Sequence, residues 1–365
     1  MITTASSLNP DTTQAVAELA AKLTSPTSST PALVVVFFSA RHAASEVARL
    51  VQAAWPQAHS IGCSSSGEIT NGAMTDGGMV AMLIDTATLP AVRIALVDDM
   101  ANPERVDAAC QALGDILQGD YDQHIGIVLM DGMSGMEEKV MDRLGDVTDL
   151  RFIGGSAGDD LAFKATQVFA DGVAYSNAAV LAVLQVPAGY RIIKTQSFVC
   201  AGKKLIPTKV DAAKREVLEF DGKPALQAYA QAVNAANAEE AAAHFMSNPV
   251  GLMDGDDPYV RSPQMFDGDA LKFYCAVSPG VELELLQSTD IIADTAQALA
   301  QTNADGKVAG ILNFHCILRT LELKAKNKTQ AYADLFTLPT VGFSTYGEAD
   351  IGHINQTSTM IALLG

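Results

Sequence analysis

One pattern of small residues followed by an acidic residue occurs three times in this chain. The copies are residues 61–68 (IGCSSSGE), 152–159 (FIGGSAGD) and 341–348 (VGFSTYGE). Glycines at such spacings are typical of tight turns and bulges, where other residues are strained. The repetition therefore predicts related structural units, each with a sharp turn at an equivalent place.

The first and third copies are the most alike, since both read Gly-x-Ser-x-x-Gly-Glu and a predicted apolar strand follows each. In extended chain alternate side chains share a face, so Ser64 would lie beside Glu68, and Ser344 beside Glu348. One interpretation is that the glycines only serve the turns of a duplicated domain. Recurrence in both halves favours the other interpretation, a ligand-binding crevice between two related lobes.

Length and composition limit the classes of protein to which this chain can belong. A chain of 365 residues predicts two domains, or one large duplicated domain. The formal charge of −18 argues against nucleic acid or an anionic membrane as a partner, because both attract Lys and Arg. We recognise no signal peptide and no apolar run of about 18 residues, so we expect a cytoplasmic protein with no membrane segment. Five cysteines without a CxxC pair indicate free thiols.

Hydrophobic periodicity predicts an α+β fold of duplicated mixed β-sheets flanked by helices, with two pseudo-related lobes and a ligand cavity. The first half alternates strands and helices, whereas strands dominate the second half. We divide the chain into a polar N-terminal segment with a helix (1–30), an N-terminal domain (31–190) and a C-terminal domain (191–365).

A strand predicted at 308–318 contains the most distinctive polar residues of the second half, and a helix is predicted at 321–335. Its even positions are apolar or small and include Cys316, whereas its odd positions include Asn313 and His315, with Arg319 just beyond. One face of the strand should therefore pack in the core, with Cys316 as a packing residue, and the other should line a polar space.

Four short motifs resemble the FIST family. They are Gly62–Ser64 with Gly67 and Glu68; residues 154–159 with Thr166, Asp171 and Gly172; residues 221–225 (DGKPA); and residues 314–319 with 342–348. The resemblance covers nearly the whole chain, as a FIST N part to about residue 190 and a FIST C part after it. It implies an intracellular sensory module without catalysis, which binds a small ligand and signals to a histidine kinase or a cyclic-di-nucleotide enzyme.

The run 313–319 (NFHCILR) is also similar to the NosP-type members, which are haem-binding nitric-oxide sensors. This similarity implies noncovalent haem b, with His315 as the iron ligand and Arg319 meeting an anionic group such as a propionate. His353 and His244 are competing ligands. The alternative is a haem-free sensor of a small metabolite such as an amino acid, whose ammonium would pair with Glu68 or Glu348 and whose carboxylate would pair with Arg319.

The residues that we assign to the ligand under these two hypotheses come from both glycine motifs and from the predicted strand. They are Ser64, Glu68, Asn313, His315, Arg319, Ser344 and Glu348. A catalytic alternative is weaker: Gly154-Gly155-Ser156-Ala157-Gly158 matches the letters of a nucleophile elbow, but a strand rather than a helix is predicted after it.

A basic cluster contrasts with the acidic background of the chain. It consists of Arg191, Lys194, Lys203, Lys204, Lys209, Lys214 and Arg215. Such a stripe indicates either a docking edge for an acidic partner protein or lysines that protect a sheet edge from aggregation. The sequence leaves a homodimer open.

Overall fold

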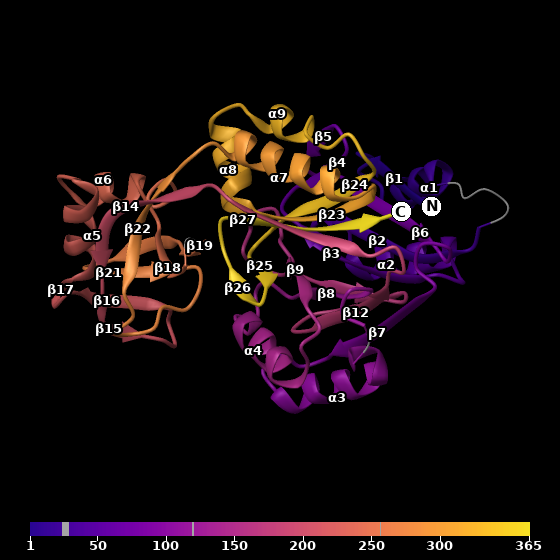
Figure 1. The fold of residues 1–365 in the computed structure, drawn as a ribbon, viewed down its shortest axis with the longest axis horizontal. Helices are drawn as coiled ribbons and strands as arrows, with labels where there is room; N and C mark the ends of the chain where they lie inside the picture. The colour runs from indigo at the N-terminus through magenta and orange to yellow at the C-terminus, as the bar shows by residue number, and fades with distance from the viewer. Residues whose placement is uncertain (24–28, 119, 256) are drawn as a thin grey trace. The chain divides into compact units, whose positions relative to one another are not determined.

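The computed structural model describes residues 1–23, 29–118, 120–255 and 257–365 (Figure 1). Residues 24–28 of the N-terminal segment lie outside this description. The chain forms two compact units, which do not follow the order of the sequence. Unit 1 comprises 1–195, 295–353 and 358–365, and unit 2 comprises 196–294 and 354–357. The α+β class with mixed sheets flanked by helices is confirmed.

Unit 1 contains a strand-and-helix arrangement that occurs three times in its described residues. The first copy consists of β1 (Ile2–Ser7), α1 (Thr12–Lys22), β2 (Pro31–Ser39), α2 (Ala44–Ala54), β3 (His59–Ser65), the hairpin β4 (Glu68–Thr70) and β5 (Ala73–Thr75), and β6 (Met79–Asp85). Residues 2–7, expected to belong to a polar segment with one helix, are thus a strand.

The second and third copies repeat this order with small changes. The second consists of β7 (Ala91–Val97), α3 (Pro103–Leu113), the 3₁₀ helix η1 (Gly114–Gln118), β8 (His124–Met130), α4 (Glu137–Val147), β9 (Phe152–Ser156), β10 (Val168–Ala170), β11 (Val173–Tyr175) and β12 (Ala179–Gln185). The third consists of β13 (Tyr190–Gln196), α7 (Ile291–Asp305), β23 (Val308–Cys316), α8 (Ile317–Ala325), α9 (Thr329–Ala333), β24 (Thr340–Thr345), β25 (Glu348–Asp350), β26 (Gly352–Ile354) and β27 (Thr357–Leu364).

The four longer strands of each copy lie in one six-stranded sheet, and the hairpin of that copy pairs with the sheet of another copy. The strand orders are β1-β6-β2-β3-β10-β11, β26-β25-β9-β8-β12-β7 and β13-β27-β23-β24-β4-β5. Parallel pairing joins β2 to β3, β8 to β9 and β23 to β24, whereas the last long strand of each copy returns antiparallel. The repeat is therefore threefold rather than the expected pair of lobes.

The inner faces of the three sheets meet in one apolar core, and helices cover their outer faces. Strand β2 reads as a continuous apolar run because both of its faces are buried. Its residues Val35 and Phe37 point to the core between the sheets, where Phe37 contacts Phe343 of the third sheet. Val36 instead packs against the outer helix layer, which includes Val47 and Val51 of α2 at helical spacing.

Unit 2 is inserted in the third copy between β13 and α7. Its elements are β14 (Phe198–Leu205), β15 (Pro207–Asp211), β16 (Glu216–Phe220), β17 (Lys223–Pro224), α5 (Ala225–Val233), α6 (Ala238–Ala243), β18 (Val250–Asp254), β19 (Asp257–Arg261), β20 (Pro263–Asp267), β21 (Ala270–Phe273) and β22 (Leu283–Ser288). Its sheets have the orders β14-β22-β18-β19 and β15-β16-β21-β20, with β17 beside β16.

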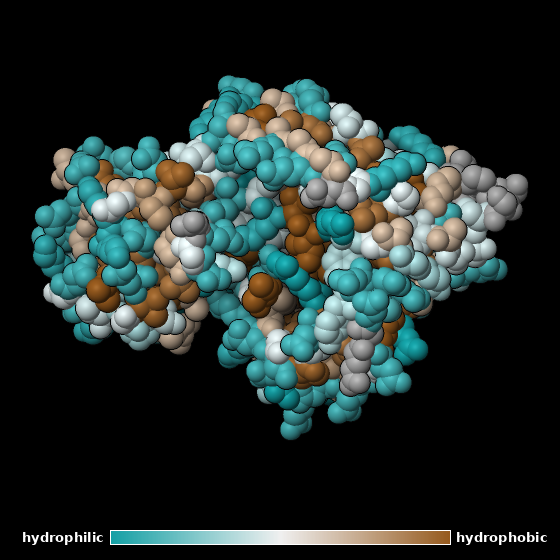
Figure 2. Space-filling view, in the orientation of Figure 1, coloured by the Kyte–Doolittle hydropathy of each residue, from teal (hydrophilic) through white to brown (hydrophobic). Residues whose placement is uncertain are grey.

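The face shown in Figure 2 is largely hydrophilic, and apolar side chains reach it only in limited patches. Within the described residues, no helix combines the length and the apolar character needed to cross a membrane.

Candidate functional site

The Gly-x-Ser core of each motif has the same place in the three sheets. Gly62, Gly154 and Gly342 lie on β3, β9 and β24, and a Cβ at each would overlap the carbonyl oxygen of Val36, Val128 and Asn313, respectively. Each glycine thus permits a close approach between the two parallel strands of its copy. The serine two residues after each glycine lies opposite a residue near the end of the neighbouring parallel strand. Ser64 is opposite Phe38, Ser156 is opposite Met130, and Ser344 is opposite His315.

The three motifs are joined to one another by main-chain hydrogen bonds in a closed cycle. Ser344 N donates to Gly67 O (2.8 Å), Gly158 N donates to Ser64 O (3.0 Å), and Ser156 N donates to Gly347 O (2.8 Å). The first and third motifs are therefore neighbours, with β4 paired to β24, as Figure 1 shows for these strands.

The acidic residue of each motif stabilises its own turn. Ser65 Oγ donates to Glu68 Oε1 (2.6 Å), and the Thr345 hydroxyl donates to Glu348 in the same way. Asp159 accepts from main-chain N–H groups of its own loop, those of 163, 164 and 165. Glu68, one of the two carboxylates expected to end rows that face a ligand, also lines a pocket.

That pocket lies where the first and third motifs meet. It has a volume of about 240 Å³ and is lined by Gly67, Glu68, Met74, Thr75, Asp76, Thr320, Lys324, Thr329 and Ser344. Lys324 Nζ pairs with Asp76 Oδ1 at 2.7 Å, and the hydroxyls of Thr320 and Ser344 lie 2.8 Å apart. The pocket thus presents one ammonium, two carboxyl groups and several hydroxyls.

Burial changes the protonation of Glu68. Its side chain is almost wholly enclosed, and this burial raises its pKa to about 7. Hydrogen bonds from Ser65 Oγ and Gly78 N (2.9 Å) oppose the shift because they stabilise the carboxylate. Near neutral pH, Glu68 is consequently divided between its acid and carboxylate forms.

The outer face of the third sheet is polar where the outer faces of the other two are apolar. Asn313 and His315 of β23 occupy the positions of Val36 and Phe38 in the first copy. Asn313 Nδ2 donates to the Tyr332 hydroxyl (3.2 Å), which also bonds His315 Nδ1 (3.0 Å). The expected polar face of this strand exists, but α8 and α9 cover it and both side chains are fully buried.

Arg319 does not continue that polar face. The strand ends at Cys316 and α8 begins at Ile317, so the predicted strand 308–318 and helix 321–335 had their boundary in the wrong place. Arg319 is 1% exposed, and its guanidinium donates to Thr195 O, Thr195 Oγ1 and Thr295 Oγ1 at 3.3–3.5 Å. Burial and the nearby Arg319 lower the pKa of His315 well below its usual value, which makes the imidazole neutral.

The sequence of this chain matches the models of two known domains. The FIST N domain matches residues 32–223, and the FIST C domain matches residues 225–349. The chain belongs to the FIST family. FIST domains are sensory ligand-binding domains rather than catalytic ones. A comparison with curated proteins found no match.

In this FIST protein His315 has one property of a haem ligand but, in the conformation of this structure, lacks another. His315 Nε2 has no hydrogen-bond partner among the described residues, as an iron ligand would require. The imidazole is, however, 0% exposed among packed polar side chains and lines none of the described pockets. A haem needs a broad apolar cavity beside its ligand.

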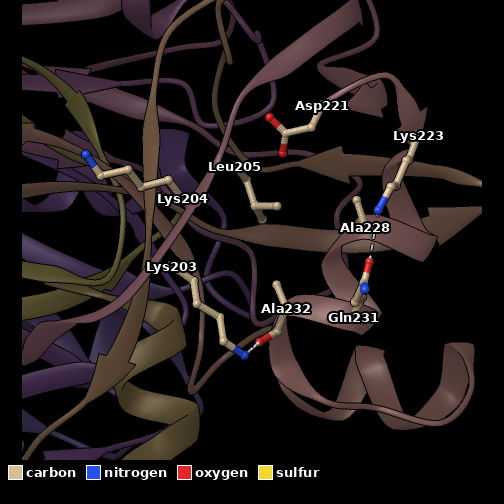
Figure 3. A pocket seen from close by; sticks show the side chains of 8 residues that line it. All are labelled: Lys203, Lys204, Leu205, Asp221, Lys223, Ala228, Gln231 and Ala232. Atoms are coloured by element: carbon tan, nitrogen blue, oxygen red, sulfur yellow. Dashed lines mark hydrogen bonds between the residues drawn. The ribbon is translucent and has the colours of Figure 1, made fainter.

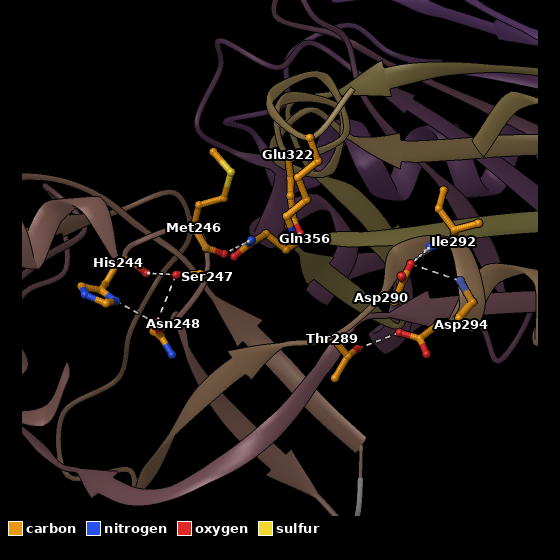
Figure 4. Close-up of polar contacts among 12 residues, drawn as sticks. His244, Met246, Ser247, Asn248, Thr289, Asp290, Ile292, Asp294, Glu322 and Gln356 are labelled. Atoms are coloured by element: carbon orange, nitrogen blue, oxygen red, sulfur yellow. Dashed lines mark hydrogen bonds and ion pairs between the residues drawn. The ribbon is translucent and has the colours of Figure 1, made fainter. Parts of the chain in front are cut away.

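The competing histidines have local structural contacts. The ring of His353 packs on Gly347, where an added Cβ would overlap it. His244 caps α6 in unit 2, and its Nδ1 hydrogen-bonds to Asn248 Oδ1 at 3.0 Å (Figure 4). Ser156 of the elbow-like run is fully buried, and its Oγ contacts no base among the described residues.

The basic cluster is divided between strands. Lys203 and Lys204 lie on β14 and Lys209 lies on β15, which are edge strands of their sheets. Lys203 Nζ donates to Ala232 O, and Lys204 pairs with Glu282, both at 2.5 Å. These two lysines line a depression of about 390 Å³, in which Figure 3 shows the ammonium groups pointing in different directions. Their places on sheet edges support the interpretation of edge protection.

Sequence reasoning missed several residues of the pocket. Thr320 and Lys324 are four residues apart on α8 and so share one helix face, which is a detectable signal. It was missed because the helix was expected to begin only at 321. Thr75 ends the β4–β5 hairpin and Asp76 follows it. This hairpin of the first copy pairs with the sheet of the third copy, and no local sequence pattern predicts that pairing.

Proposed function

We propose that this FIST protein is a sensor that binds a small zwitterionic metabolite, such as a free amino acid, in the pocket between the first and third motifs. The observation that supports this proposal is the composition of the pocket. Positive and negative side chains and several hydroxyl groups line a volume of about 240 Å³. This volume is below the roughly 300–1,000 Å³ of sites for drug-sized ligands. The ligand should therefore be small and polar.

The charged groups of the pocket assign the two ends of such a ligand. Lys324 would bind the carboxylate, while Asp76 and Glu68 would bind the ammonium. Thr320 and Ser344 would add hydrogen bonds deeper in the pocket, because both are buried. Lys324 thus replaces Arg319 in the role that the sequence suggested, and Glu348 has no part in it.

Binding of the common L-amino acids can be measured by isothermal titration calorimetry. We expect at least one to bind, and we expect Lys324→Met to weaken it about tenfold or more, because the carboxylate loses its charged donor. Lys326→Met is the matched control: Lys326 is the C-cap of the same helix, pairs with Glu322 and does not line the pocket. Equal affinities of the two variants, or no heat with any amino acid, would contradict the proposal.

The same titration should depend on pH through Glu68. An ammonium group favours the carboxylate form, so binding below pH 7 must release the proton that Glu68 carries. Affinity should therefore rise from pH 6 to pH 8, by about tenfold for one proton. Glu68→Gln should remove most of this dependence, and a variant that keeps the full dependence would assign it to another group.

Haem-based sensing of nitric oxide is the second candidate function, supported by the unpartnered Nε2 of His315. It requires α8 and α9 to open away from β23. Protein purified after growth with a haem precursor should then show a Soret band that His315→Ala abolishes, while His353→Ala and His244→Ala retain it. A colourless protein that takes up no added haemin would leave the metabolite as the ligand.

We infer that the output is a contact with a partner protein, a histidine kinase or a cyclic-di-nucleotide enzyme, rather than a reaction. Two features support this inference: FIST domains are binding domains, and Ser156 lacks a contacting base among the described residues. A ligand can bias such a contact only by its different affinities for two conformations of the sensor.

A further inference from the structure

The pocket between the first and third motifs has an exposed charged end and a buried end lined by hydroxyl groups. At the exposed end, Lys324 pairs with Asp76, and both residues are accessible to solvent. At the buried end, Thr320 and Ser344 are 1% and 0% exposed, and Glu68 beside them is also enclosed. The two ends therefore meet different parts of a ligand.

Gly67 keeps both ends within reach of one small molecule. A Cβ on Gly67 would lie 3.1 Å from Asp76 Oδ1 and 3.2 Å from Ser344 Oγ, so it would fill the space between the charged pair and the hydroxyls. Its φ of 125° is also strained for any residue with a side chain. The β4–β5 hairpin, which begins directly after Gly67, lies beside α9 (Figure 1). An amino acid held by Lys324 and Asp76 can thus place its side chain against Ser344.

The two hydroxyl groups of the buried end leave one hydrogen-bond donor unused. Thr320 Oγ1 and Ser344 Oγ lie 2.8 Å apart, and neither hydroxyl bonds another group among the described residues. Two hydroxyls carry two hydrogens, and the bond between them uses one. A buried donor without an acceptor is costly. The remaining hydrogen therefore indicates a ligand atom that accepts a hydrogen bond.

Three classes of amino-acid side chain do not suit this donor. Aliphatic side chains have no acceptor, and ammonium or guanidinium groups only donate. A carboxylate accepts, but Lys324 is the only cation among the described lining residues, and the α-carboxylate would already occupy it. A second carboxylate would share the buried end with Glu68 and have no counter-ion. Neutral hydroxyl and carboxamide groups remain.

We propose that the pocket selects amino acids whose short, neutral side chain carries an oxygen acceptor, as in serine, threonine and asparagine, and that Ser344 and Thr320 determine this specificity. Because it places the α-carboxylate on Lys324, this selectivity rests on the proposed function. Met74 is the only apolar side chain among the described lining residues, so an apolar ligand side chain gains little contact. It would also bury the O–H group without an acceptor.

Pairs of amino acids with nearly the same shape test the hydrogen bond and the charge separately. Valine lacks the hydroxyl of threonine, and aspartate carries the charge that asparagine lacks. Calorimetry at pH 8 should show that threonine binds the full chain about tenfold or more tightly than valine, and that asparagine binds more tightly than aspartate. Equal binding of threonine and valine, or tighter binding of aspartate, would overturn this selectivity but not the zwitterion site. If no amino acid binds, both proposals fail.

Variants assign the selectivity to the hydroxyl pair. Ser344→Ala combined with Thr320→Val removes both donors and should bring the affinities for threonine and valine within about twofold of each other. Should this protein not fold, as judged by circular dichroism, Ser344→Ala alone should still reduce the preference. Ser358→Ala is the matched control, because Ser358 is equally buried in the third sheet, donates to Asn313 Oδ1 (2.7 Å) and lies outside the pocket. A folded variant without Ser344 Oγ that retains the full preference for threonine would overturn the assignment.

Discussion

Replacement of Gly154 by alanine is expected to destabilise unit 1 severely. A Cβ at Gly154 would overlap the carbonyl oxygen of Val128, and the atoms that it meets are all main-chain atoms of β8. The parallel strands β8 and β9 would have to separate, which removes hydrogen bonds at the centre of a buried sheet. We expect a loss of at least about 4 kcal/mol in the free energy of unfolding, the range of severe core defects.

The single tryptophan makes this loss measurable for unit 1 alone. Trp55 lies at the end of α2 in the core beneath the first sheet, so urea denaturation followed by its fluorescence reports the unfolding of unit 1. Gly352→Ala is the control, because a Cβ there meets nothing within 4 Å and the change should stay within about 0.5 kcal/mol. A Gly154→Ala protein as stable as this control would refute the close-approach explanation of the motif.

Arg319→Met should cause the second-largest loss. The guanidinium is buried, and its removal leaves the oxygen atoms of Thr195 and Thr295 without this donor. Charged hydrogen bonds at buried sites suggest a cost of roughly 2–4 kcal/mol in the unfolding of unit 1. Thr195 and Thr295 stand where the chain leaves unit 1 and returns to it, so this cation fixes both ends of the insertion point.

Arg143→Met provides the comparison for that measurement. Arg143 pairs with the carboxylate of Asp107, but both side chains are about one-third exposed, and solvent-exposed pairs contribute little to stability. The Trp55 midpoint should therefore fall clearly more for Arg319→Met than for Arg143→Met. Equal shifts would mean that the buried hydrogen bonds of Arg319 contribute no more than a surface pair.

The sequence patterns predicted the positions of several residues of the candidate site, but not what these residues do. The glycine motifs predicted recurrent turns, and the first and third motifs do line one pocket through Gly67, Glu68 and Ser344. The parity of residues 308–316 correctly placed Asn313 and His315 on one face. The same parity failed at Arg319, because a strand pattern carries no signal of where a buried apolar run changes into a helix.

The sequence by itself determined the class of the fold, the buried strands, the glycine turns and the acidic surface, because each depends on composition or on neighbours along the chain. Only the tertiary structure decided that the repeat is threefold, that hairpins are exchanged between sheets, and that α8 and α9 cover His315. The physical reason is that main-chain pairing between distant strands is independent of side-chain identity. A borrowed hairpin therefore brings Asp76 to Lys324 without any mark in the local sequence.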